Sequence, residues 1–156
     1  MKLRVLALAL ALLLLGACGG KGRIESLSGV KVVLGSGTIT LTINAKVAAT
    51  SEDRAEGLMG IKSLPANRGM LFLFREPVRV SFYMKDTLIP LDIAFIGQGK
   101  VLQIESMVPC KVEKCPLTVP KATYEMALEV AAGTFAKAGI GLSAPVSIVG
   151  TLPRAT

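Results

Sequence analysis

The feature that most constrains the fold is the segment 38–47, in which apolar and polar side chains alternate without interruption. A β-strand places successive side chains on opposite faces, so this alternation predicts a strand with one buried and one exposed face. The apolar side chains of the predicted buried face are Ile39, Leu41, Ile43, Ala45 and Val47. An apolar, β-branched run over 30–34 comes before it, and Gly35-Ser36-Gly37 predicts the turn that joins the two strands.

Short segments of the same kind recur to the end of the chain. We predict a strand buried on both faces over 69–74, and an alternating strand over 78–84 after an interruption at Pro77. A hairpin joins 91–96 to 100–105 through Gly97-Gln98-Gly99, and strands are predicted over 122–130 and 146–149. In the strand over 122–130, one shared face is predicted for Ala122, Tyr124, Met126, Leu128 and Val130.

Helix signals are few. Thr50 or Ser51 predicts the cap of a short helix with Glu52 and Asp53 in its first turn, and 133–138 predicts one further helical turn. Many short strands with little helix predict a mainly β fold: an antiparallel β-sandwich or a partly closed barrel with one or two short helices.

The N-terminus has the pattern of an export signal. Lys2 and Arg4 precede an apolar run over 5–15, which is shorter than the roughly 20 residues of a transmembrane helix. Leu15-Gly16-Ala17-Cys18 resembles the bacterial lipobox, which implies cleavage before Cys18 and lipid attachment to its thiol. We therefore expect a signal peptide over 1–17, a lipid-anchored tether over 18–28 and a single β-rich domain over 29–156.

The remaining cysteines agree with an exported protein. With Cys18 assigned to lipid, Cys110 and Cys115 remain as an even pair, and we predict a structural disulfide between them. The alternative is a redox or metal pair, although redox pairs usually have Cys-x-x-Cys spacing and zinc needs more ligands. Gly19, rather than Asp, follows Cys18, which favours the periplasmic face of the outer membrane under the Gram-negative sorting rule over the inner membrane.

Composition excludes several function classes. The chain contains no His, which excludes Ser-His-Asp and Cys-His catalysis and nearly all zinc enzymes. The formal net charge is +7, but the basic residues are scattered and there is no Trp, so we expect no nucleic-acid partner. We also expect no cofactor and no metal site, with one alternative: five methionines follow the signal peptide, and thioether ligands suit Cu(I). These are Met59, Met70, Met84, Met107 and Met126.

A cluster of polar residues is the remaining candidate site. Lys85 and Thr87 follow one predicted strand and Asp92 begins the next, so we expect them at one end of the sheet, with Arg54 and Glu129 joining them. A Lys and a carboxylate in a concave site can bind a polar ligand or act as acid and base. The competing interpretation is structural: Lys85 or Arg54 pairs with a carboxylate, or Asp92 accepts backbone N–H bonds.

An ordered set of motifs resembles the family called domain of unknown function 192. The motifs are Gly57-Leu58-Met59, Gly69-Met70-Leu71-Phe72, 81–87 (SFYMKDT), 89–96 (IPLDIAFI), Met107-Val108-Pro109, Leu128-Glu129 and Ala132-Gly133. The resemblance implies a β-sandwich-like fold and no particular reaction. The five candidate residues match the family pattern, whereas Ile61, Tyr83 and Asp86 stand where the family often has Arg, Trp and Asn.

Taken together, these patterns favour a lipid-anchored binding or accessory module of the cell envelope, for a small polar ligand or an envelope protein. The alternatives are an enzyme that uses Lys85 with Asp92 or Glu129, and a methionine-based Cu(I) site.

Overall fold

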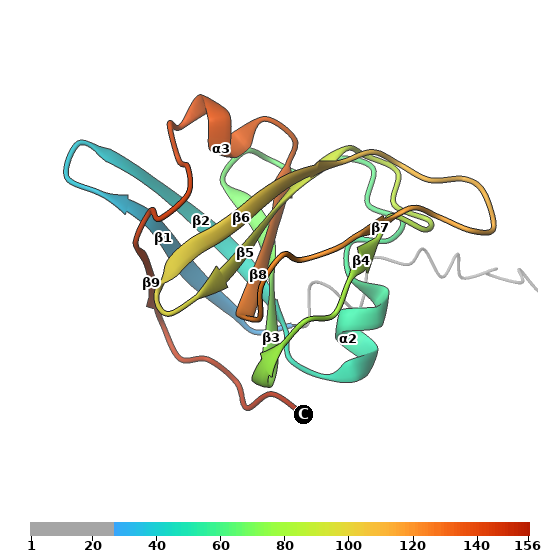
Figure 1. Ribbon diagram of the computed structural model, residues 1–156, viewed down its shortest axis with the longest axis horizontal. Helices are drawn as coiled ribbons and strands as arrows, with labels where there is room; N and C mark the ends of the chain where they lie inside the picture. Colours follow the sequence, from blue (N-terminus) through green and yellow to red (C-terminus); the bar gives the residue numbers. More distant parts are fainter. Residues whose placement is uncertain (1–26) are drawn as a thin grey trace, which may run out of the picture.

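The computed structural model of the protein describes residues 27–156. The predicted signal peptide, the predicted lipidation site at Cys18 and nearly all of the predicted tether lie outside the described residues. The elements are β1 (Gly29–Ser36), β2 (Ile39–Ala48), α2 (Ser51–Glu56), β3 (Arg68–Val78), β4 (Phe82–Tyr83), β5 (Leu91–Gly97), β6 (Lys100–Met107), β7 (Leu117–Thr118), β8 (Tyr124–Ala131), α3 (Thr134–Lys137) and β9 (Val146–Val149). The prediction of a mainly β fold with two short helices is therefore confirmed (Figure 1).

Seven strands form one sheet in the order β6-β5-β8-β3-β2-β1-β9, and β4 pairs with β7 separately. Every neighbouring pair in the large sheet is antiparallel except β2 and β3, which run parallel. Parallel neighbours need a long crossover, and the connection over 49–67, which contains α2, supplies it. The sheet is thus antiparallel, as expected, except at this one pair.

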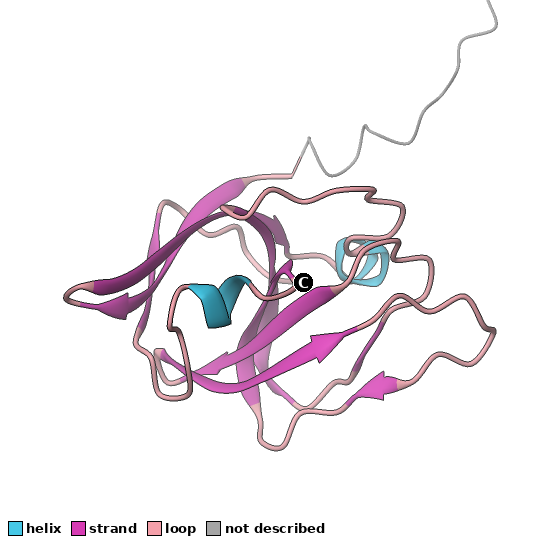
Figure 2. Cartoon of the chain, turned by 90° about the horizontal axis from the view of Figure 1, so that it is seen from above, coloured by secondary structure: helices cyan, strands magenta, loops and turns pink. Residues whose placement is uncertain are grey.

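The large sheet curls until its two edges come near each other (Figure 2). The Val101 N–H donates to Ala144 O at 2.9 Å and the Val146 N–H donates to Gly99 O at 2.7 Å, so the segment leading into β9 is bonded to the beginning of β6. These bonds satisfy backbone groups that an open edge would expose. Of the two architectures predicted from sequence, the molecule has the partly closed barrel.

Two apolar cores lie on opposite faces of the sheet. The inner core lies inside the curl, where α3 also lies (Figure 2). It includes Val32, Ile43, Leu71 and Leu128, together with Phe135 of α3. The outer core lies on the other face of β3, β5 and β8, and is covered by α2, the segment after it, and the β4 and β7 region (Figure 1). Residues 69–73 of β3, all of β5 and most of β8 are therefore buried on both faces.

Two expectations about strands are wrong. The segment 78–84 is a strand only at its ends, where Val78 closes β3 and Phe82 belongs to β4, and Val80 between them is 52% exposed. Tyr124 does not share a face with Leu128, because it packs in the outer core and Leu128 in the inner core. The cause is an irregularity opposite Tyr124, where the pairing of β3 with β8 shifts between Leu73 and Val78.

The structure confirms two predictions from local sequence, the cap of α2 and the turn between β5 and β6. The Thr50 hydroxyl accepts a hydrogen bond from the Asp53 N–H at 3.1 Å, which caps α2 as predicted. Gln98 and Gly99 have φ of 53° and 68°, which gives the tight hairpin expected between β5 and β6.

Candidate functional site

A cavity of about 470 Å³ lies on the outer face of the sheet, between α2 and the segment 78–83. Its wall is mostly apolar: Leu58, Met59, Phe72, Phe74, Val78, Val80 and Phe82. Its polar side chains come from separate elements: Ser51, Arg54, Glu56, Ser81, Tyr83, Thr87 and Glu129. The structure thus brings together three of the five residues predicted for a site, namely Arg54, Thr87 and Glu129.

Glu129 is the buried carboxyl of this cavity. It lies on β8, opposite Met70 of β3 and Ile93 of β5, and its residue is only 5% exposed. Within residues 27–156 its carboxyl has no hydrogen-bonding or charged partner. No side-chain oxygen in that range is both fully enclosed and without a hydrogen bond. The unbonded carboxyl of Glu129 is therefore not fully enclosed, and the cavity that it lines is where it is exposed. Burial raises the pKa of Glu129 to about 8.

Close approach of the backbone explains how Glu129 comes to lie in so dense a region. A Cβ atom at Gly69 of β3 would come within 2.5 Å of the Glu129 carbonyl oxygen. Glycine at this position therefore allows β3 to pack against β8 next to the candidate site.

Arg54 holds one wall of the cavity in place. Its guanidinium donates to Ala49 O at 2.7 Å, Leu73 O at 3.0 Å and Thr156 O at 2.8 Å. Its central carbon lies 5.2 Å from the centre of the Phe74 ring. These contacts tie α2 to β3 and to Thr156, so Arg54 has a structural role. Its partners are backbone oxygens, however, and not the carboxylate that the structural interpretation of the sequence expected.

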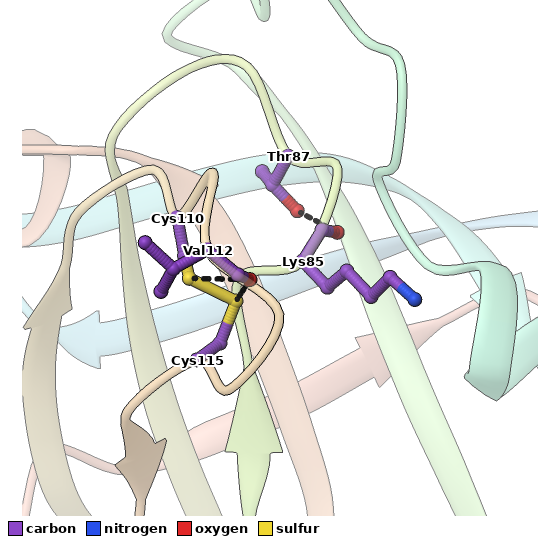
Figure 3. The surroundings of a disulfide bond; sticks show 5 residues. All are labelled: Lys85, Thr87, Cys110, Val112 and Cys115. Carbon is purple, nitrogen blue, oxygen red and sulfur yellow. Dashed lines mark hydrogen bonds between the residues drawn. A yellow bond between two sulfur atoms is a disulfide. The ribbon is translucent and has the colours of Figure 1, made fainter.

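Thr87 and Lys85 lie on the connection between β4 and β5. Thr87 is buried and lines the cavity, and its hydroxyl donates to Lys85 O at 3.5 Å (Figure 3). Lys85 is exposed and does not line the cavity, and its side chain points away from the disulfide (Figure 3). No ion pair joins Lys85 or Arg54 to Asp92 or Glu129 within the described part of the chain.

Asp92 lies apart from the cavity. It is 3% exposed, and its two carboxylate oxygens accept from the Ser106 hydroxyl and from the Gly133 N–H, each at 2.8 Å. These bonds connect β5 to β6 and to the start of α3. The acceptance of a backbone N–H is the structural alternative proposed for this residue from the sequence.

The predicted disulfide is present. Cys110 and Cys115 are bonded, and the Cys110 N–H donates to Met84 O at 3.3 Å, so the loop they close packs beside the connection that carries Lys85 (Figure 3). A loop this short contributes about 2 kcal/mol of stability on the chain-entropy model.

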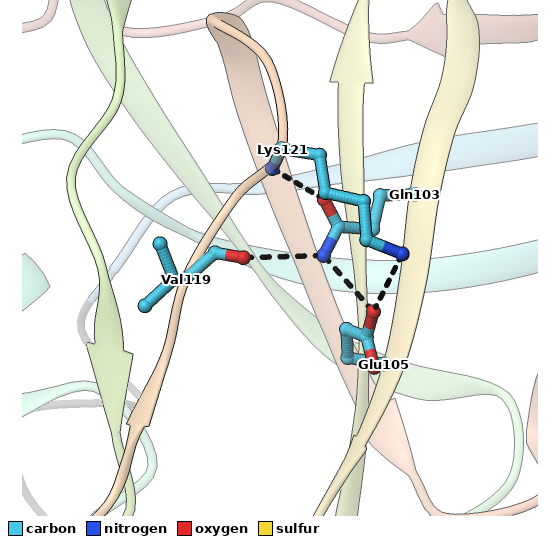
Figure 4. A network of polar contacts seen from close by, with 4 residues as sticks. All are labelled: Gln103, Glu105, Val119 and Lys121. Carbon is cyan, nitrogen blue, oxygen red and sulfur yellow. Dashed lines mark hydrogen bonds and ion pairs between the residues drawn. The ribbon is translucent and has the colours of Figure 1, made fainter.

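A polar network that was not predicted from the sequence fixes the segment after β7, which contains Val119 and Lys121. The buried Gln103 side chain donates to Glu105 Oε1 at 3.0 Å and to Val119 O at 3.3 Å, and accepts from the Lys121 N–H at 2.7 Å (Figure 4). Gln103 therefore anchors the segment after β7 to β6. A lone Gln in the alternating strand 100–105 was the available signal.

The five methionines are divided among three places. Met70, Met84 and Met107 pack in the outer core, Met126 packs against the inner core and Met59 lines the cavity. Among residues 27–156 there is no group of three or more His, Cys, Asp or Glu that could hold a metal ion.

Comparisons with known proteins agree with this architecture. The model of the family DUF192, described as an uncharacterized ACR family, matches residues 32–148. A crystal structure of a protein of unknown function from Novosphingobium aromaticivorans is similar, with 29% identity, a TM-score of 0.73, and 80% of this chain and 89% of that chain covered. A proposed transcription regulator from Sinorhizobium meliloti is 28% identical with a TM-score of 0.72, and 79% of this chain and 95% of that chain are covered. No curated protein matches the chain.

Proposed function

The chain belongs to the DUF192 family, and from that premise we propose that it is a ligand-binding module of the bacterial cell envelope, held to the membrane by a lipid on Cys18. The observation that carries the binding role is the cavity of about 470 Å³ with the unpartnered carboxyl of Glu129 in its wall. Ligand sites typically measure about 300–1,000 Å³ and combine apolar walls with a few polar groups.

The lining refines the class of ligand expected from the sequence. A wholly polar ligand would leave Phe72, Phe82 and Leu58 unused, whereas an amphipathic ligand would bury its apolar body against them. Its polar end would then meet Glu129 or Thr87, which are the buried polar side chains of the wall. We therefore favour a small ligand with an apolar body and one polar end.

Binding is tested by closing the cavity. Ala55 lines it from the exposed side of α2, so Ala55→Trp would place an indole in its mouth without disturbing the core. The matched control is Ala122→Trp, because Ala122 is also exposed but does not line the cavity. In a panel of amphipathic fragments, a true ligand at ten times its Kd stabilises the fold by about 1.4 kcal/mol. The proposal predicts that Ala55→Trp abolishes this gain and Ala122→Trp retains it; equal gains in both variants would refute the cavity as the site.

The lipid anchor rests on the sequence of residues 2–19. Within 27–156 no helix has the length and hydrophobicity needed to cross a bilayer. Metabolic labelling with an alkyne fatty acid tests the anchor in the full chain. Cys18→Ser should lose the label and leave the membrane fraction, whereas the double variant Cys110→Ser/Cys115→Ser should keep the label. Retention of the label by Cys18→Ser would contradict the assignment.

The outer membrane, on its periplasmic face, is the proposed location, on the basis of Gly19. Separation of inner and outer membranes from labelled cells tests it, and recovery with the inner membrane would overturn it.

A further inference from the structure

Glu129 is the starting point for identifying what the cavity binds. Its neighbours across the sheet are Met70 and Ile93, both buried and apolar, and neither can donate a hydrogen bond from its side chain. An ionised carboxylate accepts hydrogen bonds and donates none, so in these surroundings it lacks any compensating group. A ligand that supplies a positive charge and N–H donors would provide what the fold does not.

The aromatic wall supports a cation independently. Phe72 and Phe82 pack edge to face at 5.0 Å between ring centroids, and Phe74 and Tyr83 also line the cavity. Aromatic faces attract cations through their quadrupoles. Phe74 already has the Arg54 guanidinium over its ring, which leaves the other three rings to contact a ligand.

Two other charged groups line the cavity, and both belong to α2. Arg54 directs its donors at three backbone carbonyls and forms no ion pair with Glu129, so it does not neutralise that carboxyl. Glu56 brings a negative charge to the wall, which partly offsets the positive charge of Arg54. The lining thus contains two carboxyls and one arginine whose donors are committed to the protein.

Resting on the binding function proposed above, we propose that the cavity binds a small primary amine with an apolar body. The ammonium group donates to the Glu129 carboxylate, and the hydrocarbon body packs against Leu58, Phe72 and Phe82. A primary amine is preferred to a quaternary one because only the former has N–H groups to donate.

The pKa of Glu129 adds an observable consequence. Burial raises this pKa to about 8, so the free protein holds a proton on the carboxyl at pH 7. An amine arrives as ammonium, and its charge favours the ionised carboxylate. The O–H bond of the carboxyl then breaks and its proton passes to the buffer. The other titratable groups that line the cavity are Arg54, Glu56 and Tyr83.

The test is calorimetry of the folded protein with 3-phenylpropylamine, 3-phenylpropan-1-ol and trimethyl(3-phenylpropyl)ammonium. The proposal predicts that the primary amine binds at least tenfold more tightly than either analogue. Titrations at pH 7 in two buffers of different ionisation enthalpy should show release of nearly one proton with the amine and none with the alcohol. This second readout uses wild-type protein and does not depend on any variant folding.

Glu129→Gln should bring the amine and the alcohol to equal affinity, with no proton release. Glu125→Gln is the matched control, because Glu125 is exposed on the same strand and does not line the cavity, and it should behave as the wild type. Equal binding of amine and alcohol to the wild type would overturn the amine inference and leave the binding function standing. Binding of no fragment at all, in the panel or here, would overturn the binding function itself.

Discussion

Asp92 and Glu129 are two buried carboxyls on neighbouring strands, and their surroundings are opposite. Asp92 on β5 is 3% exposed and Glu129 on β8 is 5% exposed. Asp92 accepts two hydrogen bonds of 2.8 Å, from Ser106 and Gly133, whereas Glu129 has no partner within residues 27–156. Burial is similar in both, so the hydrogen-bonding partners are what distinguish the two carboxyls.

Asp92 and Glu129 differ in whether hydrogen bonds offset the free energy needed to remove a charged carboxylate from water. Hydrogen bonds to a charged group offset that cost and are worth more than neutral ones. Asp92 obtains this offset from the fold. Glu129 does not, and its pKa rises to about 8 so that the neutral form predominates at pH 7.

The largest expected effect comes from removing the partnered carboxyl. Asp92→Ala leaves the Ser106 hydroxyl and the Gly133 N–H without their acceptor in a buried region, and should lower the free energy of unfolding by about 4 kcal/mol. Asp92→Asn keeps one acceptor oxygen and should cost about half as much. Urea denaturation at pH 7 measures the free energy of unfolding of both variants. A loss below about 1 kcal/mol for Asp92→Ala would contradict the structural role of Asp92.

Removing the charge of Glu129, which has no partner in the described residues, should raise the free energy of unfolding instead of lowering it. The native state keeps a proton on Glu129 between its ordinary pKa of 4.5 and the raised value of about 8, whereas the unfolded state does not. Stability of the wild type therefore falls as pH rises through that window, and the whole cost is present above it. Glu129→Gln should match the wild type near pH 5 and exceed it by about 4 kcal/mol near pH 9. Unfolding in urea at several pH values measures this, and a pH-independent difference would contradict it.

Arg54 adds a third case, because this charged side chain has hydrogen-bonding partners, as Asp92 does, and lines the cavity, as Glu129 does. Arg54→Met keeps most of the side-chain stem but removes three hydrogen bonds to carbonyls, and should cost about 2 kcal/mol. Since the guanidinium stays charged throughout, this loss should be equal at pH 5 and pH 9. Urea denaturation at pH 5 and pH 9 measures the loss in the free energy of unfolding. A loss that changes with pH would indicate that Arg54 and Glu129 interact electrostatically.

Much of the fold could be predicted because the signals are local. The alternation over 38–47, the glycine turn over 97–99 and the cap at Thr50 each depend on neighbouring residues, and each is present in the structure. The parallel pairing of β2 with β3 and the brief strand within 78–84 depend on distant contacts. No local pattern contains that information.

The candidate site was predictable in its residue types but not in its arrangement. Glu129 could be singled out, and the alternation over 122–130 places it on the face opposite Leu128 and Val130, but the alternation does not say whether that face is covered. Ala127, two positions earlier on the same face, was the overlooked sign that this face is covered. Whether a buried carboxylate has partners depends on Ser106 and Gly133, which come from other elements and only the fold brings to Asp92.

The proposed binding role depends on a Glu129 carboxyl that lies in the cavity without a partner. Titration of the Glu129 side-chain carboxyl carbon by 13C NMR tests it most directly, with Glu129→Gln to assign the resonance. We expect a titration midpoint near pH 8, and a fall of that midpoint when 3-phenylpropylamine is added. A midpoint near 4.5, unchanged by the amine, would contradict it.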